Sequence, residues 1–288
     1  MKLHFNHFLP IIDAGRGIES TILLSSTARS GSTFFANILN HNQDHRILFE
    51  PLSVKHVKEA GELKLPMFIP YDLEAPRYTA FYTKLLCGDI SNKWIDRENR
   101  SGFYRKRIVK EVRSNLHLSW LQNQFPNLKI VLLMRNPISV IDSWERMNFE
   151  NGHELKRIIN EELFQRIPKE LKTSFKNEKN AFILSLYFWC INNAVANELN
   201  DKYSLVVNYE DLLERNKETF KNIDSFTGIK IQEAPESSFE RISSSSSEQK
   251  LSNFDRLMKL KEQIGLPGLS QAKELLDAFG LANYYQIL

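Results

Sequence analysis

A segment rich in serine, threonine, arginine and glycine, residues 27–33, has the residue types of an anion-binding loop. It follows the apolar run 21–25 and precedes a segment with helical spacing, so backbone N–H groups and a helix N-terminus would point at one spot. Arg29 adds a fixed positive charge, and Gly31 allows the backbone to approach a ligand closely. The other candidate ligands are Ser30, Ser32 and Thr33. A serine-rich turn that only caps a helix fits the composition equally well.

The pattern of this segment argues against two common nucleotide-binding motifs. The G-x-x-x-x-G-K-[ST] loop of nucleoside-triphosphate enzymes is missing, and no G-K-[ST] triplet occurs anywhere in the chain. Without that lysine and the magnesium-binding hydroxyl, kinase or GTPase chemistry is disfavoured. Gly15 and Gly17 lack the third glycine of a dinucleotide-binding turn.

Two further candidate groups follow apolar runs that predict strands. Arg135 directly follows residues 130–134 and would lie at the carboxyl edge of a sheet, where ligands bind in open α/β folds. Ser143 comes eight residues later, inside the next predicted helix, and spacing alone does not bring it to Arg135. Glu50 follows the run at residues 47–49 and is a candidate general base at the same edge. A surface arginine and a surface glutamate are the alternatives.

The elements that must hold these residues alternate between strand and helix. Apolar runs predict strands at residues 21–25, 47–49, 108–112, 130–134 and 205–207. Helical spacing occurs at residues 32–42, 116–124, after Pro137, and from Glu210 to Gly228. Strands joined through helices imply a parallel sheet covered by helices on both faces. Residues 151–200 have only helical patterns, so we expect one α/β domain over residues 1–288 with a helical insert.

The composition fits a globular protein and excludes several other classes. Hydrophobic residues make up 42% and charged residues 25% of the chain, which is too apolar for a disordered protein. The net charge of +3 is too small to indicate nucleic acid as a partner. No apolar run is long enough for a transmembrane segment, and Cys87 and Cys190 are too few for a disulfide framework. We expect a cytoplasmic protein, and nothing in the sequence specifies an oligomeric state.

Two other clusters are weaker candidates. His41 and His45 are four residues apart and could share one face of a helix, but no third ligand accompanies them, so a metal site is not expected. Aromatic residues with helical spacing occur later and are expected in the core rather than in a sugar-binding surface: Phe182, Tyr187, Phe188 and Trp189.

Four segments, in order along the chain, resemble the sulfotransferases that use 3′-phosphoadenosine 5′-phosphosulfate (PAPS). TARSGSTFFANIL is similar to their 5′-phosphosulfate loop in the form of the carbohydrate and tyrosylprotein branches, and VLLMRNPISVIDSW is similar to their 3′-phosphate motif. LVVNYEDLLERNKETFKNIDSFTGI resembles a third family landmark, a strand followed by a helix. FEP at residues 49–51 resembles a turn of the carbohydrate branch.

The resemblance implies a three-layer P-loop-like α/β fold and transfer of a sulfuryl group from PAPS to an acceptor hydroxyl, without a metal. The FEP turn favours a carbohydrate or glycolipid as the acceptor. The resemblance places Arg29 through Thr33 on the 5′-phosphosulfate, with Arg135 and Ser143 on the 3′-phosphate. It also makes Glu50 the general base, while Arg29 replaces the lysine of cytosolic members.

Other features bear on the ends of the site. Lys110 and Arg113 resemble a basic pair of the family, whereas Ile138 stands where many members carry arginine. Ser243 to Ser247, followed by Lys250, fit either a flexible linker or a loop that closes over the 3′-phosphate. Residues 55–105, read as a basic loop, and the insert would shape the acceptor cleft. A nucleotide kinase or phosphotransferase of similar fold and a non-catalytic nucleotide-binding scaffold are the alternative functions.

Overall fold

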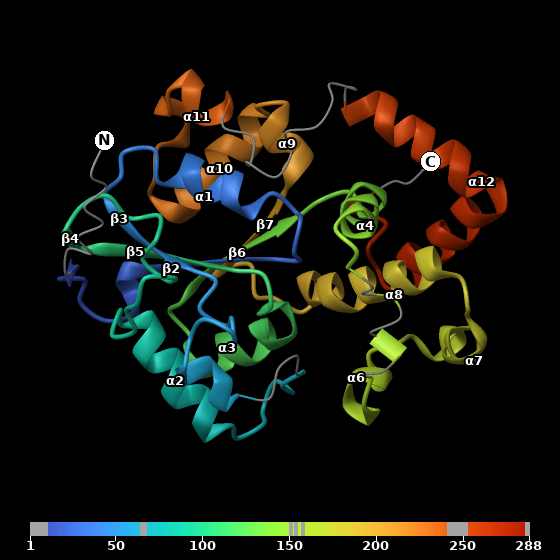
Figure 1. The fold of residues 1–288 in the computed structure, drawn as a ribbon, viewed down its shortest axis with the longest axis horizontal. Helices are drawn as coiled ribbons and strands as arrows, with labels where there is room; N and C mark the ends of the chain where they lie inside the picture. The colour runs from blue at the N-terminus through green and yellow to red at the C-terminus, as the bar shows by residue number, and fades with distance from the viewer. Residues whose placement is uncertain are drawn as a thin grey trace, which may run out of the picture.

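A parallel sheet of five strands forms the centre of the protein in the computed structural model (Figure 1). The structure describes residues 11–63, 68–149, 152, 155–156, 159–240 and 253–285. The strand order is β3-β5-β2-β6-β7. The strands are β2 (Thr21–Ser26), β3 (His45–Phe49), β5 (Lys106–Glu111), β6 (Lys129–Met134) and β7 (Ser204–Asn208). All the strand predictions are therefore confirmed, with ends shifted by at most two residues.

Strand β2 lies in the middle of this sheet, and all of its residues are buried. From β2 the chain builds β3 and β5 on one side and then crosses to build β6 and β7 on the other. The connections diverge at the carboxyl end of β2, the place where ligands bind in open α/β sheets. Ser25 pairs with Glu111 of β5 and with Leu132 of β6, so three neighbouring strands end at a similar level.

Helices cover both faces of the sheet, as the alternation of elements predicts (Figure 1). One face packs against α1 (Ser32–Leu39) and α10 (Lys217–Thr227). The opposite face packs against α2 (Pro76–Leu86) and α3 (Leu118–Gln124) in a larger apolar core. The three-layer P-loop-like α/β fold is thus confirmed.

A further group of helices lies beside the sheet (Figure 1). Its described α-helices are α4 (Pro137–Arg146), α6 (Glu161–Gln165), α7 (Lys172–Asn177), α8 (Ala181–Asn193) and α12 (Asn253–Ala278). Two short helices, α9 (Tyr209–Leu213) and α11 (Glu236–Glu240), lie near α1 and α10 instead (Figure 1). Single turns of 3-10 helix are η1 (Ile18–Ser20), η2 (Glu59–Glu62), η3 (Asn115–His117), η4 (Lys169–Leu171), η5 (Ala194–Asn197) and η6 (Ile231–Glu233). Tyr187 and Trp189 of α8 are buried, which confirms that they pack in the core. Helix α12 is interrupted at Gly265, whose φ is 71°.

Two predictions about local structure are wrong. Residues 55–105, predicted to form a loop, contain α2. Apolar residues at helical spacing, which the prediction overlooked, bury one face of that helix: Tyr78, Phe81, Tyr82, Leu85 and Leu86. The single helix predicted from Glu210 to Gly228 is two helices, because Arg215 has a left-handed φ of 54° and Asn216 caps the start of α10.

A buried ion-pair network closes the amino end of the sheet. Two short strands that the sequence did not predict pair beside it: β1 (Ile12–Asp13) and β4 (Phe103–Tyr104). Asp13 Oδ2 accepts hydrogen bonds from Arg46 Nη1 at 3.0 Å and from Arg107 Nε at 2.8 Å. Arg46 Nε also donates to Asp96 at 2.8 Å. Both arginines are at most 1% exposed, so their charges depend on these carboxylates.

We expect Asp13→Asn to lower the free energy of unfolding by about 3–5 kcal/mol, the usual cost of removing one partner from a buried ion pair. The substitution leaves Arg46 and Arg107 without their shared counter-charge. Urea unfolding measures the loss. Glu236→Gln is the matched control, because its pair with Arg215 is exposed and should not shift the unfolding midpoint. Equal stability of the Asp13→Asn protein and the wild type would contradict this account of the network.

Candidate active site

The loop between β2 and α1 has the geometry of an anion cradle. Gly31 precedes the first residue of α1 with a φ of 89°, and Arg29 has a φ of 71°, which is uncommon outside glycine. Thr27 Oγ1 and Ser30 Oγ share a hydrogen bond of 2.7 Å, and Ser30 is fully buried. Helix α1 then begins with the buried Ser32 and the half-buried Thr33. The backbone N–H groups at this helix N-terminus therefore lie at the carboxyl end of the central strand.

A side chain at Gly31 would collide with Tyr209. A Cβ atom built on Gly31 would lie 2.3 Å from Tyr209 Cε2. Tyr209 is the first residue of α9, and its ring packs edge to face on Phe34 of α1, with centroids 5.8 Å apart. Only glycine therefore fits between this loop and the ring.

Gly31→Ala should lower the free energy of unfolding by about 2–5 kcal/mol, from the left-handed dihedral (about 1–2) and from overlap with Tyr209 (about 1–3). Gly228→Ala is a matched control, since Gly228 has a φ of 76° but no atom within 4 Å of a Cβ placed there. It should lose only the dihedral part. Thermal or urea unfolding of both variants tests the difference, and equal losses would show that Tyr209 does not exclude a side chain.

Hydrogen bonds with α4 and with Arg135, which follows β6, hold the loop. Trp144 Nε1 donates to Ala28 O at 2.9 Å, and Arg29 Nε donates to Ser143 Oγ at 3.0 Å. Arg135 Nη1 donates to Arg29 O at 3.1 Å. Arg135 and Ser143 are 106 and 114 residues from Arg29 in sequence, yet both contact it. The fold thus brings together predicted site residues that spacing alone could not connect.

Positive charge gathers around these contacts. The guanidinium carbon of Arg135 lies 4.7 Å from the centroid of the Tyr209 ring, and Arg135 Nε is buried without a hydrogen-bond partner. Burial lowers the pKa of Arg29, and the charges of Arg146 and Arg135 lower it further. Because arginine stays protonated in proteins, this part of the site suits an anion.

Two residues that directly follow β7 also lie near Arg135 and the loop, and neither was among the predicted site residues. The Tyr209 ring lies close to Gly31 of the loop and to the guanidinium of Arg135, and Glu210 Oε1 accepts a hydrogen bond from Asn136 N at 3.1 Å. Asn136 in turn caps α4, where its side chain accepts from the N–H of Ile138 at 3.0 Å. The sequence signal for Tyr209 and Glu210 was their place directly after a strand, at the ligand-binding edge.

Glu50 lies directly after β3 and is held by two cations. Its Oε1 atom is 2.6 Å from Lys110 Nζ, its Oε2 atom is 3.3 Å from Arg113 Nη1, and its side chain is 17% exposed. Burial raises the pKa of Glu50, but the charges and hydrogen bonds of Lys110 and Arg113 outweigh burial, so the pKa lies below its ordinary value. Glu50 is therefore an ionised carboxylate at neutral pH.

Glu50 and the anion-binding loop lie on the same edge of the sheet, two strands apart. Phe49 of β3 pairs with Lys110 of β5, and Ser25 of β2 pairs with the next residue of β5, Glu111. Neighbouring strands are about 4.8 Å apart, which puts the backbones of β3 and β2 about 10 Å apart.

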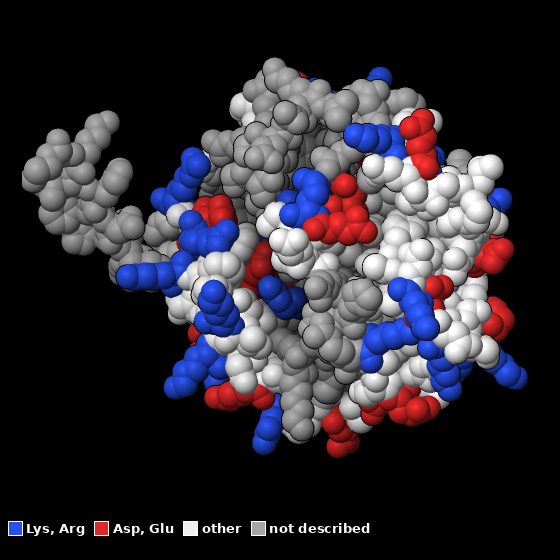
Figure 2. Space-filling model, turned by 45° about the vertical axis from the view of Figure 1, so that its right-hand side comes forward, with Lys and Arg blue, Asp and Glu red and all other residues white. Residues whose placement is uncertain are grey.

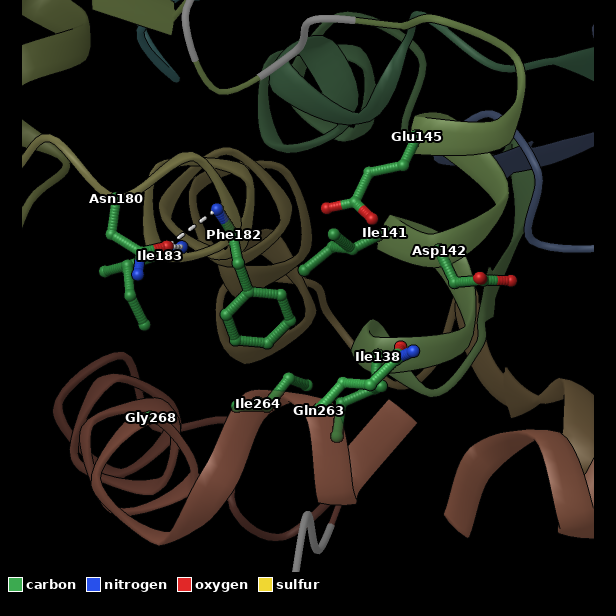
Figure 3. A pocket seen from close by; sticks show the side chains of 10 residues that line it. All are labelled: Ile138, Ile141, Asp142, Glu145, Asn180, Phe182, Ile183, Gln263, Ile264 and Gly268. Atoms are coloured by element: carbon green, nitrogen blue, oxygen red, sulfur yellow. Dashed lines mark hydrogen bonds between the residues drawn. The ribbon is translucent and has the colours of Figure 1, made fainter. Parts of the chain in front are cut away.

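A cavity of about 220 Å³ lies between α4, α8 and α12, away from this site (Figure 3). Among the described residues its lining contains two carboxylates, Asp142 and Glu145, and no lysine or arginine, so this part of the cavity does not suit an anion. Ile138 lines this cavity and is 1% exposed. Five residues along a helix turn it by about 140°, so Ile138 and Ser143 project from different faces of α4. Ile138 is therefore a packing residue and does not supply the contact that arginine makes in many related sequences.

The charges on the molecular surface are mixed. Figure 2 shows Lys and Arg side chains spread over one face of the protein, with Asp and Glu side chains among them. This distribution agrees with the small net charge of +3. The attraction for an anion is therefore local to the site, where Arg29 and Arg135 meet.

The predicted histidine pair does not share a helical face. Helix α1 ends at Leu39, so His41 lies in the following turn and His45 begins β3. Within the described residues, no three His, Cys, Asp or Glu side chains gather as a metal site requires. No described helix has the length and apolar character needed to span a membrane. Lys250 and the run from Ser243 to Ser247 lie outside the described residues.

A parallel sheet whose central strand leads into an anion cradle, with helices on both faces, defines a P-loop-like α/β protein. The chain belongs to the sulfotransferase domain family, because the model of that family matches residues 19–274. Sulfuryl transfer is therefore the general reaction of this chain, and the predicted membership of the sulfotransferases is confirmed.

Several solved structures are similar to the chain. The sulfotransferase domain from the curacin biosynthetic pathway is 17% identical, with a TM-score of 0.47, and the match covers 94% of this chain and 98% of that one. The sulfotransferase domain of the Synechococcus PCC 7002 olefin synthase is 16% identical, with a TM-score of 0.46, and the match covers 94% of this chain and 97% of that one. A sulfotransferase from Alicyclobacillus acidocaldarius is 13% identical, with a TM-score of 0.41, and the match covers 89% of this chain and 95% of that one. No curated protein matches the chain.

Proposed function

We propose that this chain transfers the sulfuryl group of PAPS to an acceptor hydroxyl of a carbohydrate or glycolipid, with Glu50 as the general base. The observation that carries the proposal is the contact of Arg29 with both Ser143 and Arg135 at the carboxyl end of the central strand. These residues come from the two segments that resemble the phosphate motifs of PAPS enzymes. Their meeting supports a single nucleotide site rather than two unrelated segments.

In this proposal the loop after β2 binds the 5′-phosphosulfate, and residues before and within α4 bind the 3′-phosphate. Arg135, whose Nε has no partner, and Ser143 hold the 3′-phosphate, and Lys250 contributes from the late loop. Arginine charge does here what magnesium does in phosphoryl transfer, so no metal is needed. The residues assigned to the 5′-phosphosulfate are Arg29, Ser30, Gly31, Ser32 and Thr33.

When bound, PAPS supplies the sulfuryl group, whose bond to the bridging oxygen of the 5′-phosphate breaks as the acceptor oxygen bonds to sulfur. Glu50 takes the proton of the acceptor hydroxyl. Arg29 and the N–H groups of the loop stabilise the negative charge that develops on the leaving phosphate. Lys110 and Arg113 hold the carboxylate of Glu50 in its ionised form and fix its position. The products are a sulfate ester and 3′-phosphoadenosine 5′-phosphate.

We also propose that the chain forms one sulfotransferase domain and works in the cytoplasm. The family match extends over residues 19–274 and so includes the predicted insert. Cys87 and Cys190 are both free thiols, which supports a reducing compartment.

Transfer of label from ³⁵S-labelled PAPS to a panel of sugars and glycolipids, in excess chelator, tests the proposed function. We expect a labelled sulfate ester at an undiminished rate with chelator. Magnesium-dependent transfer from ATP, with none from PAPS, would instead establish a kinase. Binding of 3′-phosphoadenosine 5′-phosphate without transfer to any acceptor would indicate a non-catalytic scaffold.

Arg135→Ala should weaken binding of 3′-phosphoadenosine 5′-phosphate more than tenfold, because a charge-assisted hydrogen bond contributes about 1.5–3 kcal/mol. Adenosine 5′-phosphate, which lacks the 3′-phosphate, should lose much less. Ser143→Ala should show the same preference to a smaller degree. Isothermal titration measures both ligands, with Ser139→Ala on the same helix as control. Equal losses for the two ligands would mean that Arg135 supports the fold and does not contact the phosphate.

A further inference from the structure

The end of the chain returns from α12 to the carboxyl edge of the sheet. After Ala278 the backbone turns at Gly280, whose φ is 69°. The turn is closed by hydrogen bonds from Leu281 N to Leu276 O at 2.7 Å and from Asn197 Nδ2 to Phe279 O at 3.0 Å. Phe279, Leu281 and Tyr285 are all buried. This segment is therefore packed into the protein as a defined part of the fold.

Tyr285 reaches a residue of the candidate site. Its hydroxyl donates to Glu210 Oε2 at 2.9 Å, across 75 residues of sequence. Its ring packs edge to face on Trp189 of α8, with centroids 5.8 Å apart, and the residue is 7% exposed. Burial and the charge of Glu210 raise the pKa of Tyr285 well above its ordinary value. The hydroxyl therefore keeps its proton and remains a donor over the whole range in which the protein would be studied.

Both carboxylate oxygens of Glu210 are engaged, and neither is engaged by Arg135. Oε2 accepts from Tyr285, and Oε1 accepts from Asn136 N at 3.1 Å. Asn136 directly follows Arg135, and Glu210 directly follows Tyr209, on whose ring Arg135 lies. Among the described residues, no ion pair joins Arg135 to a carboxylate, and its Nε atom has no partner. The charge of Glu210 raises the pKa of Tyr285 and the charge of Arg135 lowers it, so both groups lie near this hydroxyl while the carboxylate is held in other contacts.

We propose that Tyr285 is a positioning residue for the 3′-phosphate site, an inference that rests on the proposed function. By holding Oε2 of Glu210, the tyrosine hydroxyl keeps this carboxylate from turning to Arg135. The guanidinium therefore stays available for the 3′-phosphate of the nucleotide. Without the hydroxyl, Glu210 retains only its bond to Asn136 N and competes with the phosphate for Arg135.

Tyr285→Phe tests this role because it removes one oxygen atom and keeps the ring on Trp189. We expect binding of 3′-phosphoadenosine 5′-phosphate to weaken about tenfold, the range of a hydrogen bond to a charged group. Adenosine 5′-phosphate should bind as it does to the wild type. Tyr284→Phe, which removes the same atom from the neighbouring residue, should change neither affinity. Isothermal titration gives the affinities, and thermal unfolding monitors the fold of each variant.

The double variant Glu210→Gln/Tyr285→Phe separates competition from general support of the fold. Since the neutral amide does not compete for Arg135, Tyr285→Phe should have little effect on the ratio of the two affinities in the Glu210→Gln protein. A full tenfold loss there, or an equal loss for both nucleotides in Tyr285→Phe, would overturn the inference. If Tyr285→Phe fails to fold, the Glu210→Gln protein alone still tests the inference. It should bind 3′-phosphoadenosine 5′-phosphate more tightly than adenosine 5′-phosphate, as the wild type does. Loss of this preference would contradict the proposed competition between Glu210 and the 3′-phosphate for Arg135. A wild-type protein without that preference would reject the proposed function itself.

Discussion

Replacing Glu50 by Gln should lower the turnover of sulfuryl transfer at least about 100-fold and leave nucleotide binding unchanged, because the amide cannot take the acceptor proton. The change keeps the shape of a side chain that lies 2.6 Å from Lys110 Nζ and 3.3 Å from Arg113 Nη1. Single-turnover rates with labelled PAPS, together with titration of 3′-phosphoadenosine 5′-phosphate, separate the two effects. Glu59→Gln, at an exposed position, is the control. Wild-type turnover in Glu50→Gln would remove Glu50 from the mechanism.

The same residue sets an expectation for pH. Since the pKa of Glu50 in the folded protein lies below its ordinary value, the carboxylate is already ionised throughout the neutral range. The ion pairs of Glu50 therefore stabilise the protein at neutral pH, and this contribution is lost as the pH falls through the lowered pKa. The rate of transfer should fall over the same acidic range. In the Glu50→Gln protein, the free energy of unfolding and the residual rate of transfer should depend less on pH over this acidic range than in the wild type.

Arg29→Ala should lower the turnover about 100- to 1000-fold, the usual effect of removing a donor that stabilises developing negative charge. The guanidinium is held by the bond from its Nε to Ser143 Oγ at 3.0 Å, in the loop that would receive the leaving phosphate. Arg29→Lys keeps the charge but loses the planar set of donors, so its rate should be intermediate.

Initial rates at saturating PAPS measure the effect on turnover. Arg100→Ala is the matched control, since Arg100 is exposed and far along the sequence from the loop. A rate for Arg29→Ala within a few-fold of the wild type would show that Arg29 contributes only to the fold of the loop.

Much of the fold could be predicted because strands buried on both faces have a distinct sequence pattern. The apolar run at residues 130–134 and the runs at 21–25 and 205–207 each became a strand of the sheet. Helix α2 was missed because its apolar residues do not form a continuous run but recur with the spacing of one helical face. The division between α9 and α10 depends on the left-handed φ of Arg215, which its residue type does not indicate.

The candidate site could be predicted only in part. Arg29 and Gly31 were evident from the loop itself, but the hydrogen bond from Arg29 to Ser143 spans 114 residues and depends on the order of the strands. The roles of Tyr209 and Tyr285 depend on tertiary contacts as well, with Gly31 and Glu210 respectively. Residue types and local spacing contain no information on which distant side chains meet.

Arginines lie at both ends of the sheet, but their electrostatic surroundings differ. At the amino end, Arg46 and Arg107 are paired with the carboxylates of Asp13 and Asp96. At the carboxyl end, Arg29 is held with a φ of 71° in the field of Arg135, which lowers its pKa. A left-handed backbone at Arg29 and the nearby positive charge of Arg135 therefore coincide in this loop.

An anion bound at this site screens the repulsion between Arg29 and Arg135 and so stabilises the carboxyl end of the sheet. Bringing the two positive charges together costs free energy when the chain folds, and the binding of an anion offsets this cost. Binding of an anion should therefore increase the protection of the carboxyl end of the sheet against local opening.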